Sequence, residues 1–373
     1  MTDKSIDKLI EELREKYTPE GSVIPVVSKS SDRPPQKYIP CTSPALGFVM
    51  GTSGWPVGHL IEFFGKEHAG KTTLMMLGLK EAHEFYDGKR PIAYIDIEHR
   101  YNEKWAKMLG LPEDLIVVQP TDGEQATDIM QTLIHPKESK GVCAIGFDSI
   151  GAASPTREQV TFEERSAIVA GNAGIMTRNV RTIAPLANIY GATVFYCNQL
   201  RQDLSGYNRP MTPGGNAIKH MMSVRLYLWP NTESKSKKRD KIDGQDVQVG
   251  FEMNFRTVKN TFGPPGRDGK SDFYFRPSRL YDGIGFDIES DIQALGILTE
   301  VIERKGSYYQ YGDVRAQGRD PFFQKIKENG LYDVLLKDVQ GSLSSRFTDA
   351  APSMFEDPGE RGPSYVEIDD PEV

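Results

Sequence analysis

The sequence has no apolar run approaching the roughly 18 residues that a membrane-spanning helix needs, and its charged N-terminus is unlike a signal peptide. It has only three cysteines, Cys41, Cys143 and Cys197, and no C-x-x-C pair. Two of these cysteines lie in apolar stretches, so we expect reduced core residues rather than disulfides or a zinc site. These absences predict a cytoplasmic protein with no membrane partner.

An excess of positive charge is also absent, since the formal net charge of the 373 residues is −7. Much of this charge is local, because residues 351–373 contain seven acids and one arginine, a net of −6. The remaining chain is near neutral, so the overall acidity does not exclude a nucleic-acid partner. Residues 348–373 are predicted to form a disordered acidic tail, with a solvating and a regulatory role both open.

Apolar residues near the N-terminus recur with helical spacing between Ile6 and Leu13, which predicts an amphipathic helix over residues 3–17. Residues 18–57 are rich in proline, serine and glycine and are predicted to be a linker. The helix therefore resembles an arm whose apolar face needs a partner.

From residue 59 onward, short apolar runs alternate with helical segments, which predicts an α/β fold with a mostly parallel sheet. Later strand-like runs fit antiparallel hairpins at a sheet edge. Predicted strands lie at 59–64, 92–96, 115–119, 142–148, 192–199, 223–229, 247–259 and 271–275, with helices at 71–86, 105–110 and 123–134. The predicted domains are 1–45 (helix and linker), 46–285 (core), 286–347 (small α+β domain) and the tail.

The stretch "GKEHAGKTT" fits the phosphate-loop pattern G-x-x-x-x-G-K-[ST] between a predicted strand and a predicted helix. Glycines let successive backbone N–H groups surround phosphates at a helix N-terminus. Lys71 would neutralise the β- and γ-phosphates, Thr72 would bind Mg²⁺, and Thr73 would add a phosphate contact. The predicted nucleotide-binding residues of this loop are Gly65, Glu67, His68, Ala69, Gly70, Lys71, Thr72 and Thr73.

Two acids at predicted strand ends are candidates for the chemistry of a nucleotide triphosphate. Asp148 is predicted to share the Mg²⁺ ion with Thr72. Glu98 is a candidate for positioning or deprotonating water, although spacing alone favours an exposed strand-end acid equally. Trp105 has two interpretations, stacking on adenine or the commoner role of core packing.

Six stretches in order resemble the successive motifs of the RecA family of DNA strand-exchange recombinases, over about residues 40–335. Six motifs in order are highly specific, and the differences between them indicate a divergent member, for which a phage genome is one candidate source. The stretches are "IEFFGKEHAGKTTL", "AYIDIEHRYNEKWAKMLG", "QPTDGEQA", "FDSIGAASP", "FYCNQLR" and "PGGNAIKHMMSVRL".

The resemblance implies a RecA-like P-loop ATPase core that uses ATP and Mg²⁺, with particular roles for several residues. Glu98 matches the catalytic glutamate, and Lys71 is its catalytic partner at the phosphates. Asn102 and Trp105 match residues that contact adenine. Gln199 matches the glutamine that senses the γ-phosphate and passes its state to the next loop.

The resemblance also implies a filament in which ATP lies between neighbouring protomers. Lys259 matches the first of two lysines that reach the phosphates of the adjacent subunit, whereas Thr261 replaces the second. The N-terminal helix resembles the arm that packs on the next protomer. Repeated head-to-tail contacts of this kind yield a helical filament.

Residues 200–212 match the second DNA-binding loop of the family, and 157–166 match the first. Glycines, arginines and an aromatic side chain suit single-stranded DNA, whose phosphates and bases they contact. The acids of 157–166 and Gly174, where a basic residue is usual, indicate a weaker or redistributed DNA affinity. The predicted DNA-binding residues are Arg181, Arg201, Tyr207, Arg209, Gly214, Gly215 and Asn216.

Two other basic groups are candidates for double-stranded DNA. One is predicted to be a solvated hairpin tip, and the other lies in residues 286–347, which resemble a small domain associated with duplex capture. The first group is Lys235, Lys237, Lys238, Arg239 and Lys241, and the second is Lys305, Arg315 and Arg319.

The predicted function is an ATP-dependent recombinase that forms a helical filament on single-stranded DNA and exchanges strands with a homologous duplex. A single-strand-binding protein or a loader is an expected partner. Two alternatives are a hexameric helicase of the same nucleotide core and a P-loop switch or kinase that does not bind DNA.

Overall fold

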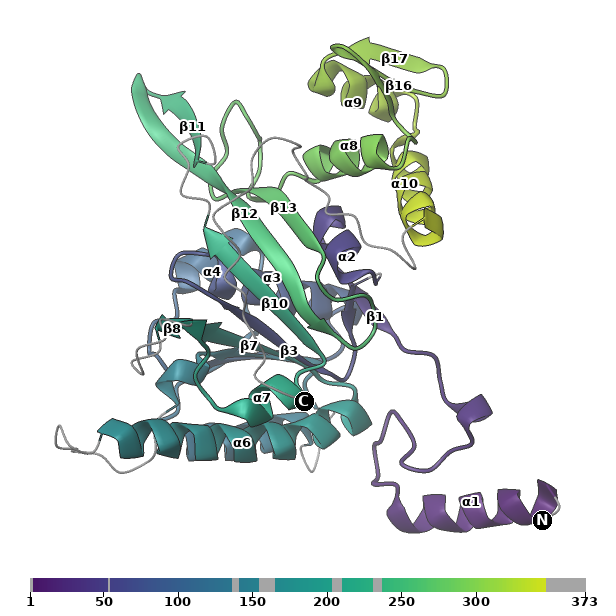
Figure 1. The fold of residues 1–373 in the computed structure, drawn as a ribbon, viewed down its shortest axis with the longest axis vertical. Helices are drawn as coiled ribbons and strands as arrows, with labels where there is room; N and C mark the ends of the chain where they lie inside the picture. The colour runs from purple at the N-terminus through teal and green to yellow at the C-terminus, as the bar shows by residue number, and fades with distance from the viewer. Residues whose placement is uncertain are drawn as a thin grey trace. The chain divides into compact units, whose positions relative to one another are not determined.

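The structure, drawn in Figure 1, is a computed structural model. Its chain forms two compact units. The described residues are 3–52, 54–135, 141–153, 165–202, 210–230 and 237–346. The first unit comprises 1–39, 55–65 and 71–225, and the second comprises 40–54, 66–70 and 226–373. Among the described residues, no helix is long and apolar enough to cross a membrane.

The first unit contains a parallel sheet, as the alternating pattern predicts. Its strands have the order β3-β7-β6-β4-β5, and each neighbouring pair is parallel. Four of them are buried almost throughout, which explains their near-continuous apolar sequences. The strands are β3 (Leu60–Gly65), β4 (Ile92–Asp96), β5 (Ile116–Val118), β6 (Ala144–Asp148) and β7 (Thr193–Gln199).

Helices cover both faces of this sheet. On α3, Gly78 lies so close to Phe195 of β7 that a Cβ atom would be 2.8 Å from the ring. On the other face, the Tyr196 hydroxyl donates to Asn179 Oδ1 of α6 at 2.8 Å. The helices of the unit are α1 (Asp3–Tyr17), α3 (Lys71–Phe85), α4 (Glu103–Leu109), α5 (Gly123–Ile134), α6 (Arg165–Tyr190) and α7 (Asn216–Met221), with 3₁₀ turns η1 (Ser30–Asp32) and η2 (Ile150–Ala152).

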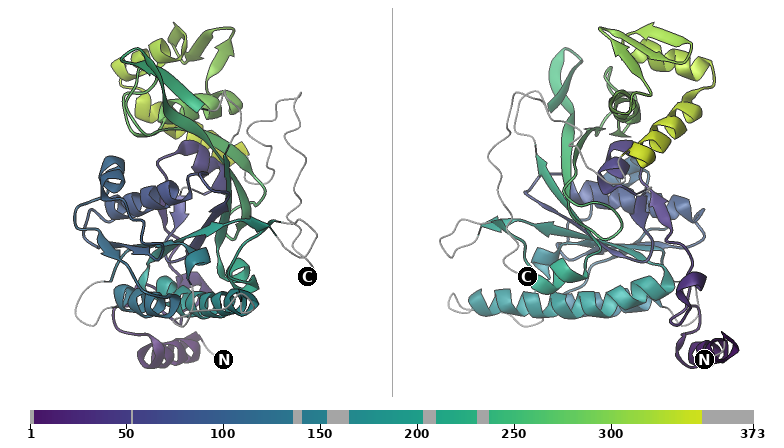
Figure 2. Two further views of the ribbon diagram at one scale, coloured as in Figure 1. Left: turned by 90° about the vertical axis from the view of Figure 1, so that its left-hand side faces the viewer. Right: turned by 45° about the vertical axis from the view of Figure 1, so that its right-hand side comes forward.

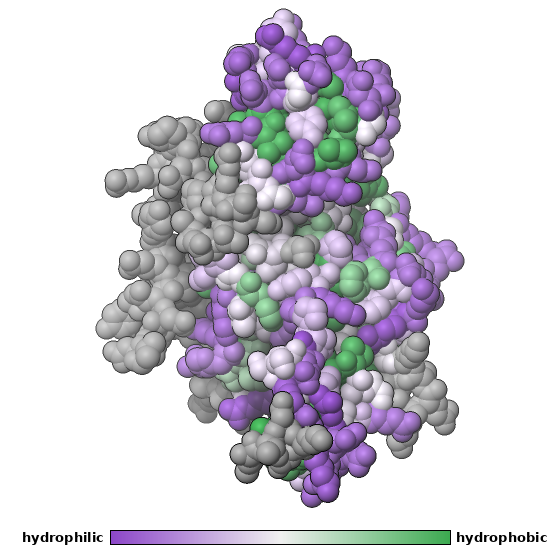
Figure 3. Space-filling model, turned by 90° about the vertical axis from the view of Figure 1, so that its right-hand side faces the viewer, coloured by the Kyte–Doolittle hydropathy of each residue, from purple (hydrophilic) through white to green (hydrophobic). Residues whose placement is uncertain are grey.

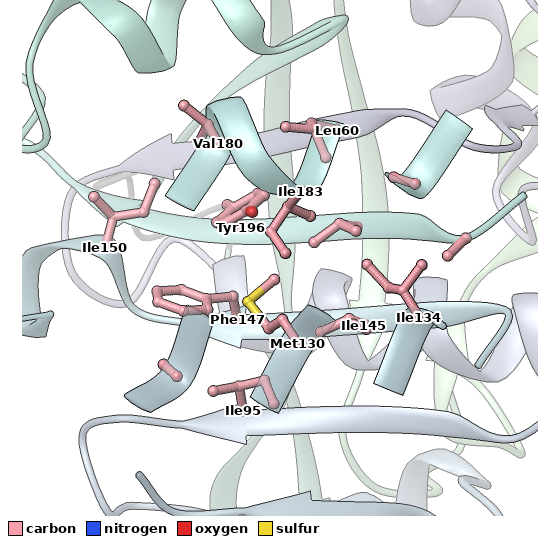
Figure 4. Packing of buried hydrophobic residues seen from close by; sticks show 14 of the residues in the cluster. Leu60, Ile95, Met130, Ile134, Ile145, Phe147, Ile150, Val180, Ile183 and Tyr196 are labelled. Atoms are coloured by element: carbon pink, nitrogen blue, oxygen red, sulfur yellow. The ribbon is translucent and has the colours of Figure 1, made fainter. Parts of the chain in front are cut away.

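Figure 4 shows the apolar core between the sheet and helices α5 and α6. Phe147 and Tyr196 have ring centroids 5.3 Å apart, and Met130, Val180 and Ile183 from the helices pack in the same cluster. All five side chains are buried. Burial of this apolar surface holds the ends of β3, β6 and β7 in fixed positions, where the predicted nucleotide site begins.

The second unit contains strands in the order β14-β13-β12-β10, of which β10 begins in the first unit, and β11 also pairs with β12. Figure 2 shows the long, curved β12. The expected hairpins are therefore confirmed, since β11–β12, β12–β13 and β13–β14 are antiparallel. The strands are β10 (Val224–Pro230), β11 (Lys237–Ile242), β12 (Gln245–Asn260), β13 (Asp268–Tyr274) and β14 (Gly285–Phe286).

The prediction of a basic hairpin tip is wrong, because the cations at 237–241 lie within strand β11. Lys238 Nζ is 2.5 Å from Asp272 Oδ2, and Arg239 Nε is 2.7 Å from Asp246 Oδ2. Cations in a strand can pair with acids of other strands of the sheet, here Asp246 of β12 and Asp272 of β13, so a run of basic residues does not by itself indicate a loop. Lys235 lies outside the described residues.

The predicted linker over 18–57 is also incomplete, since it contains helix α2 (Pro44–Met50) and the short strands β1 (Tyr38–Pro40) and β2 (Gly54–Pro56). Ser43 caps α2 by accepting a hydrogen bond from Leu46 N at 3.2 Å. Most of this short helix is buried, so it lacks the polar face that makes helical periodicity visible in a sequence.

The prediction for residues 286–347 is a small α+β module, and the described residues of this range contain both helices and strands. Figure 3 shows its surface, at the top, as mostly polar with smaller apolar areas. Arg319 Nη1 is paired with Asp287 at 2.8 Å, whereas Lys305 is largely exposed. The elements are α8 (Ile288–Leu298), β15 (Glu303–Lys305), β16 (Tyr308–Tyr311), β17 (Val314–Gln317), α9 (Arg319–Glu328) and α10 (Tyr332–Arg346).

A buried carboxyl group joins three elements of the second unit. Asp291 of α8 accepts hydrogen bonds from Ser43 Oγ at 2.6 Å and Ala45 N at 3.3 Å through Oδ2, and from Ser271 Oγ at 2.8 Å through Oδ1. Burial raises the pKa of Asp291 to about 7, despite these donors. The folded state therefore binds a proton that the unfolded state has lost above about pH 4.

This shift predicts a pH-dependent stability. Because the folded pKa of Asp291 is raised, its contribution is most favourable at acid pH and is lost as the pH rises to about 7. Between pH 5 and 8 the loss amounts to about 2–3 kcal/mol in the free energy of unfolding. Asp291→Asn should remove that difference, because the amide can keep all three partners without ionising. Urea unfolding of both proteins at pH 5 and 8 tests this, and an equal pH dependence would contradict it.

Candidate nucleotide and DNA site

The predicted phosphate loop connects β3 to α3 and has the backbone shape that its sequence predicts. Gly70 has φ of 89°, and a Cβ atom there would lie 2.5 Å from Met253 Cε, so only glycine fits without displacement. His68 also has a positive φ, 61°. Lys71 begins α3, and its Nζ donates to Gly65 O at 3.1 Å. This position suits a lysine that turns toward phosphates when they are present.

Thr72 and Asp148 lie 76 residues apart in the sequence and meet in the structure. Thr72 Oγ1 donates to Asp148 Oδ2 at 2.7 Å, and Tyr94 Oη donates to the same oxygen at 2.9 Å. Burial raises the pKa of Asp148, which leaves a carboxylate that a cation would stabilise. Hydroxyl and carboxylate oxygens are the ligands that Mg²⁺ prefers, so the two predicted residues fit this ion.

Glu98 follows β4, and its two carboxylate oxygens have different partners. Ser149 Oγ donates to Oε1 at 2.5 Å, and Arg100 Nη1 lies 3.2 Å from Oε2. The Glu98 side chain is only 19% exposed, whereas Arg100 is 81% exposed. Glu98 is therefore not the freely exposed strand-end acid that the spacing left open.

Asp96 fixes the loop that carries Glu98. It accepts hydrogen bonds from Arg100 N at 3.0 Å, Tyr101 N at 2.8 Å and Gln119 Nε2 at 2.9 Å, and it is buried. Gln119 and Ser149 carry no predicted role. The one available signal was the aspartate itself, since a strand-end Asp often accepts from backbone N–H groups a few residues on.

The two residues predicted to contact adenine are neighbours at the start of α4. Asn102 Oδ1 accepts from Trp105 N at 3.0 Å and caps the helix. Asn102 is exposed and Trp105 is half-buried. Capping explains Asn102 without a ligand, so a nucleotide contact of either residue stays a prediction.

Gln199 ends β7 beside the phosphate loop. Strands β3 and β7 are in register so that Gly65 pairs with Gln199, and Leu200 N donates to Gly65 O at 3.2 Å. The first glycine of the phosphate loop and the last residue before the predicted DNA-binding loop are therefore adjacent. The parallel pairing brings together two motifs that are 134 residues apart.

The predicted DNA-binding residues have different surroundings. Arg181 is exposed on α6, as are Gly215 and Asn216 at the start of α7. Gly214 is buried with φ of 98°, and a Cβ atom there would lie 2.0 Å from Ile218 Cδ1, so its backbone conformation and its packing favour glycine without a DNA contact. Arg201 lies in β8 (Arg201–Gln202), which pairs with β9 (Pro210–Met211), while Tyr207, Arg209 and most of 157–166 lie outside the described residues.

The residues predicted to act across a subunit boundary belong to the second unit. Lys259 is half-buried near the end of β12, and Thr261 is exposed just after this strand. Their roles toward a neighbouring protomer stay predictions.

Comparisons with known proteins place this chain in a family. The RecA N-terminal domain family matches residues 4–278. Protein RecA of Caldanaerobacter subterraneus is 34% identical over 297 residues, which cover 79% of this chain and 80% of that protein. Protein RecA of Thermus thermophilus is 30% identical over 340 residues, 90% of this chain and 93% of that protein. Protein RecA of Rickettsia bellii is 30% identical over 352 residues, 93% and 95% of the two chains.

The chain therefore belongs to the RecA family. It is a RecA-type recombinase, and its nucleotide core is that of a family of DNA-dependent ATPases. These matches favour the recombinase over the hexameric helicase and over a P-loop protein that does not bind DNA.

Proposed function

We propose that this recombinase uses ATP as a switch for filament assembly on single-stranded DNA. Lys71 and the backbone of residues 65–73 would bind the phosphates, and Thr72 with Asp148 would hold Mg²⁺. The 2.7 Å contact between Thr72 and Asp148 supports this arrangement. When bound, the ion would offset the charge of the phosphate oxygens.

Glu98 is the residue proposed to orient the attacking water. Ser149, which donates to Oε1, would fix the direction of the carboxylate. Gln199 would respond to the γ-phosphate, and Asn102 with Trp105 would contact the adenine. Hydrolysis would then weaken the assembly and release DNA, which resets the switch.

The observation that carries this proposal is the register that pairs Gly65 with Gln199. A displacement of one strand end changes the backbone hydrogen bond from Leu200 N to Gly65 O, so the phosphate loop and the start of 200–212 have a direct physical connection. A nucleotide switch of DNA binding needs such a connection.

The exposed apolar residues of helix α1 support the proposal that the protein forms filaments. Its apolar residues Ile6 and Leu9 are 38% and 51% exposed. A neighbouring protomer would cover this stripe, with Lys259 of each protomer directed toward its neighbour's ATP. A head-to-tail contact that does not close gives a helical filament rather than a ring.

The proposed partners are single-stranded DNA, duplex DNA and a single-strand-binding protein or loader. The proposed location is the cytoplasm. For the DNA surface, Arg181, Gly215 and Asn216 are exposed candidates. Gly214 is a poor target for a test of DNA contact, because any side chain there would disrupt its packing against Ile218.

The test is ATP hydrolysis by the purified protein with and without a long single-stranded DNA, with Asn216→Ala beside the unaltered chain. We expect DNA to accelerate hydrolysis several-fold, and the variant to need more DNA for the same rate because it loses a contact at the exposed start of α7. A rate indifferent to DNA would contradict the proposed switch. Closed rings alone in electron micrographs with ATP would instead favour the helicase.

A further inference from the structure

A buried ion pair lies immediately before the phosphate loop. Arg225 Nε is 2.5 Å from Glu62 Oε2, and the two side chains are 7% and 0% exposed. The Arg225 guanidinium also lies over the Phe64 ring, 4.7 Å from its centroid. Taking two charges out of water costs free energy that their attraction often only offsets, so stability by itself is a weak reason for such a pair.

Asn198 connects this ion pair to two further segments. Its Nδ2 donates to Glu62 Oε1 at 2.7 Å and to Pro213 O at 3.0 Å, and its Oδ1 accepts from Gln199 N at 3.0 Å. The side chain is fully buried. One amide therefore contacts β3, the end of β7 and the segment that leads into α7.

Arg225 makes a second contact with the same segment, since its Nη2 lies 3.5 Å from Thr212 Oγ1. Thr212 and Pro213 are thus both held by the cluster of Glu62, Asn198 and Arg225. This Glu62–Asn198–Arg225 cluster has one end at the strand before the phosphate loop and the other at Thr212, the last residue of the predicted DNA-binding loop, and at Pro213 directly after it.

We propose that the Glu62–Asn198–Arg225 cluster is a positioning device that couples the nucleotide site to the segment 212–213. This inference rests on the proposed ATP switch and deepens it. When the backbone at Gln199 shifts with the nucleotide state, the side chain of Asn198 shifts with it, because its Oδ1 accepts a hydrogen bond from Gln199 N. The Pro213 carbonyl and the Glu62 carboxylate both accept from Asn198 Nδ2. Both groups must then follow Asn198 or lose this hydrogen bond.

The charges make the coupling reciprocal between the two ends of the cluster. Each oxygen of Glu62 has one strong donor, so the carboxylate has a defined orientation in a low-dielectric interior. A shift at either end therefore costs free energy unless the other end follows. The three residues of the cluster contact neither the nucleotide nor the DNA. They affect how strongly DNA binding changes ATP hydrolysis.

The experiment compares Asn198→Ala with Asn179→Ala. Asn179 is a matched control, because it is equally buried in the same unit and bonds to Thr127 and Tyr196, away from the phosphate loop and from 212–213. Both variants should lower the melting temperature. Asn198→Ala should keep its affinity for ATP and its hydrolysis rate without DNA, but lose most of the several-fold stimulation by single-stranded DNA, which Asn179→Ala should retain.

Equal stimulation of the two variants would overturn the inference. If Asn198→Ala does not fold, Thr212→Val provides a second test of the same quantity, because it removes only the hydroxyl that faces Arg225 and keeps the shape of the side chain. We expect Thr212→Val to lose part of the stimulation of hydrolysis at saturating DNA, where a weakened DNA contact has no effect, and full stimulation at saturation would overturn the inference. If DNA fails to stimulate the unaltered chain, the proposed switch itself fails, which separates the two outcomes.

Discussion

Lys71→Ala is expected to reduce ATP hydrolysis in the presence of single-stranded DNA by about 100-fold or more. Lys71 is the first residue of α3, and the Gly65 carbonyl 3.1 Å from its Nζ keeps the ammonium group at the phosphate loop. Charge spreads over the phosphate oxygens as the bond to the γ-phosphate breaks, so the loss of this cation raises the barrier. Nucleotide-dependent filaments should also be lost.

The matched control is Lys80→Ala. Lys80 lies on the same helix and is paired with Glu84 at 3.7 Å, a long and partly exposed contact of the kind that contributes little to stability. Hydrolysis by both variants is measured with saturating DNA over a range of ATP concentrations. Normal strand exchange by Lys71→Ala, or an equal loss in Lys80→Ala, would contradict the assignment of the phosphate site.

Glu98→Gln is expected to lower kcat by about 10²–10⁴-fold while the apparent affinity for ATP stays nearly the same. The carbonyl oxygen of glutamine can still accept the hydrogen bond of Ser149, so the loop should keep its shape. What is lost is the negative charge that orients and polarises water. Filaments stabilised by ATP should persist for longer than those of the unaltered chain, because turnover is slow.

Glu103→Gln serves as the control for Glu98→Gln. It lies on the next helix, α4, and is paired with Lys107 at 2.8 Å with 70% of its side chain exposed. Steady-state kinetics should separate the two variants, with a loss of kcat only at position 98. Unchanged turnover in Glu98→Gln would remove this residue from the mechanism.

The strongly periodic elements of the fold could be predicted from the sequence. The predicted helices over 3–17 and near 123–134 are both present, because amphipathic spacing marks them. Helix α2 was not predicted, since its seven residues are mostly buried and follow a proline-rich stretch. The cations of β11 were misassigned because their partners, such as Asp272, are distant in the sequence.

Some contacts of the candidate site could likewise be predicted from the sequence, and others could not. The contact between Thr72 and Asp148 could be predicted, because parallel strands end at one edge of a sheet and the phosphate loop begins there. The contact of Ser149 with Glu98 and the ion pair of Glu62 with Arg225 could not, since such pairs carry no local pattern. The first depends on the register of β4 and β6, and the second joins β3 to Arg225 at the start of β10, which only the folded chain reveals.

The most direct test of the central claim is homologous strand exchange. Circular single-stranded DNA is incubated with the purified protein, Mg²⁺ and ATP, and with either a homologous or an unrelated linear duplex. Joint molecules should form with the homologous duplex alone, only when ATP is present, and not with Lys71→Ala. Unwinding of both duplexes, or no joint molecules with the homologous one despite ATP hydrolysis, would contradict the recombinase.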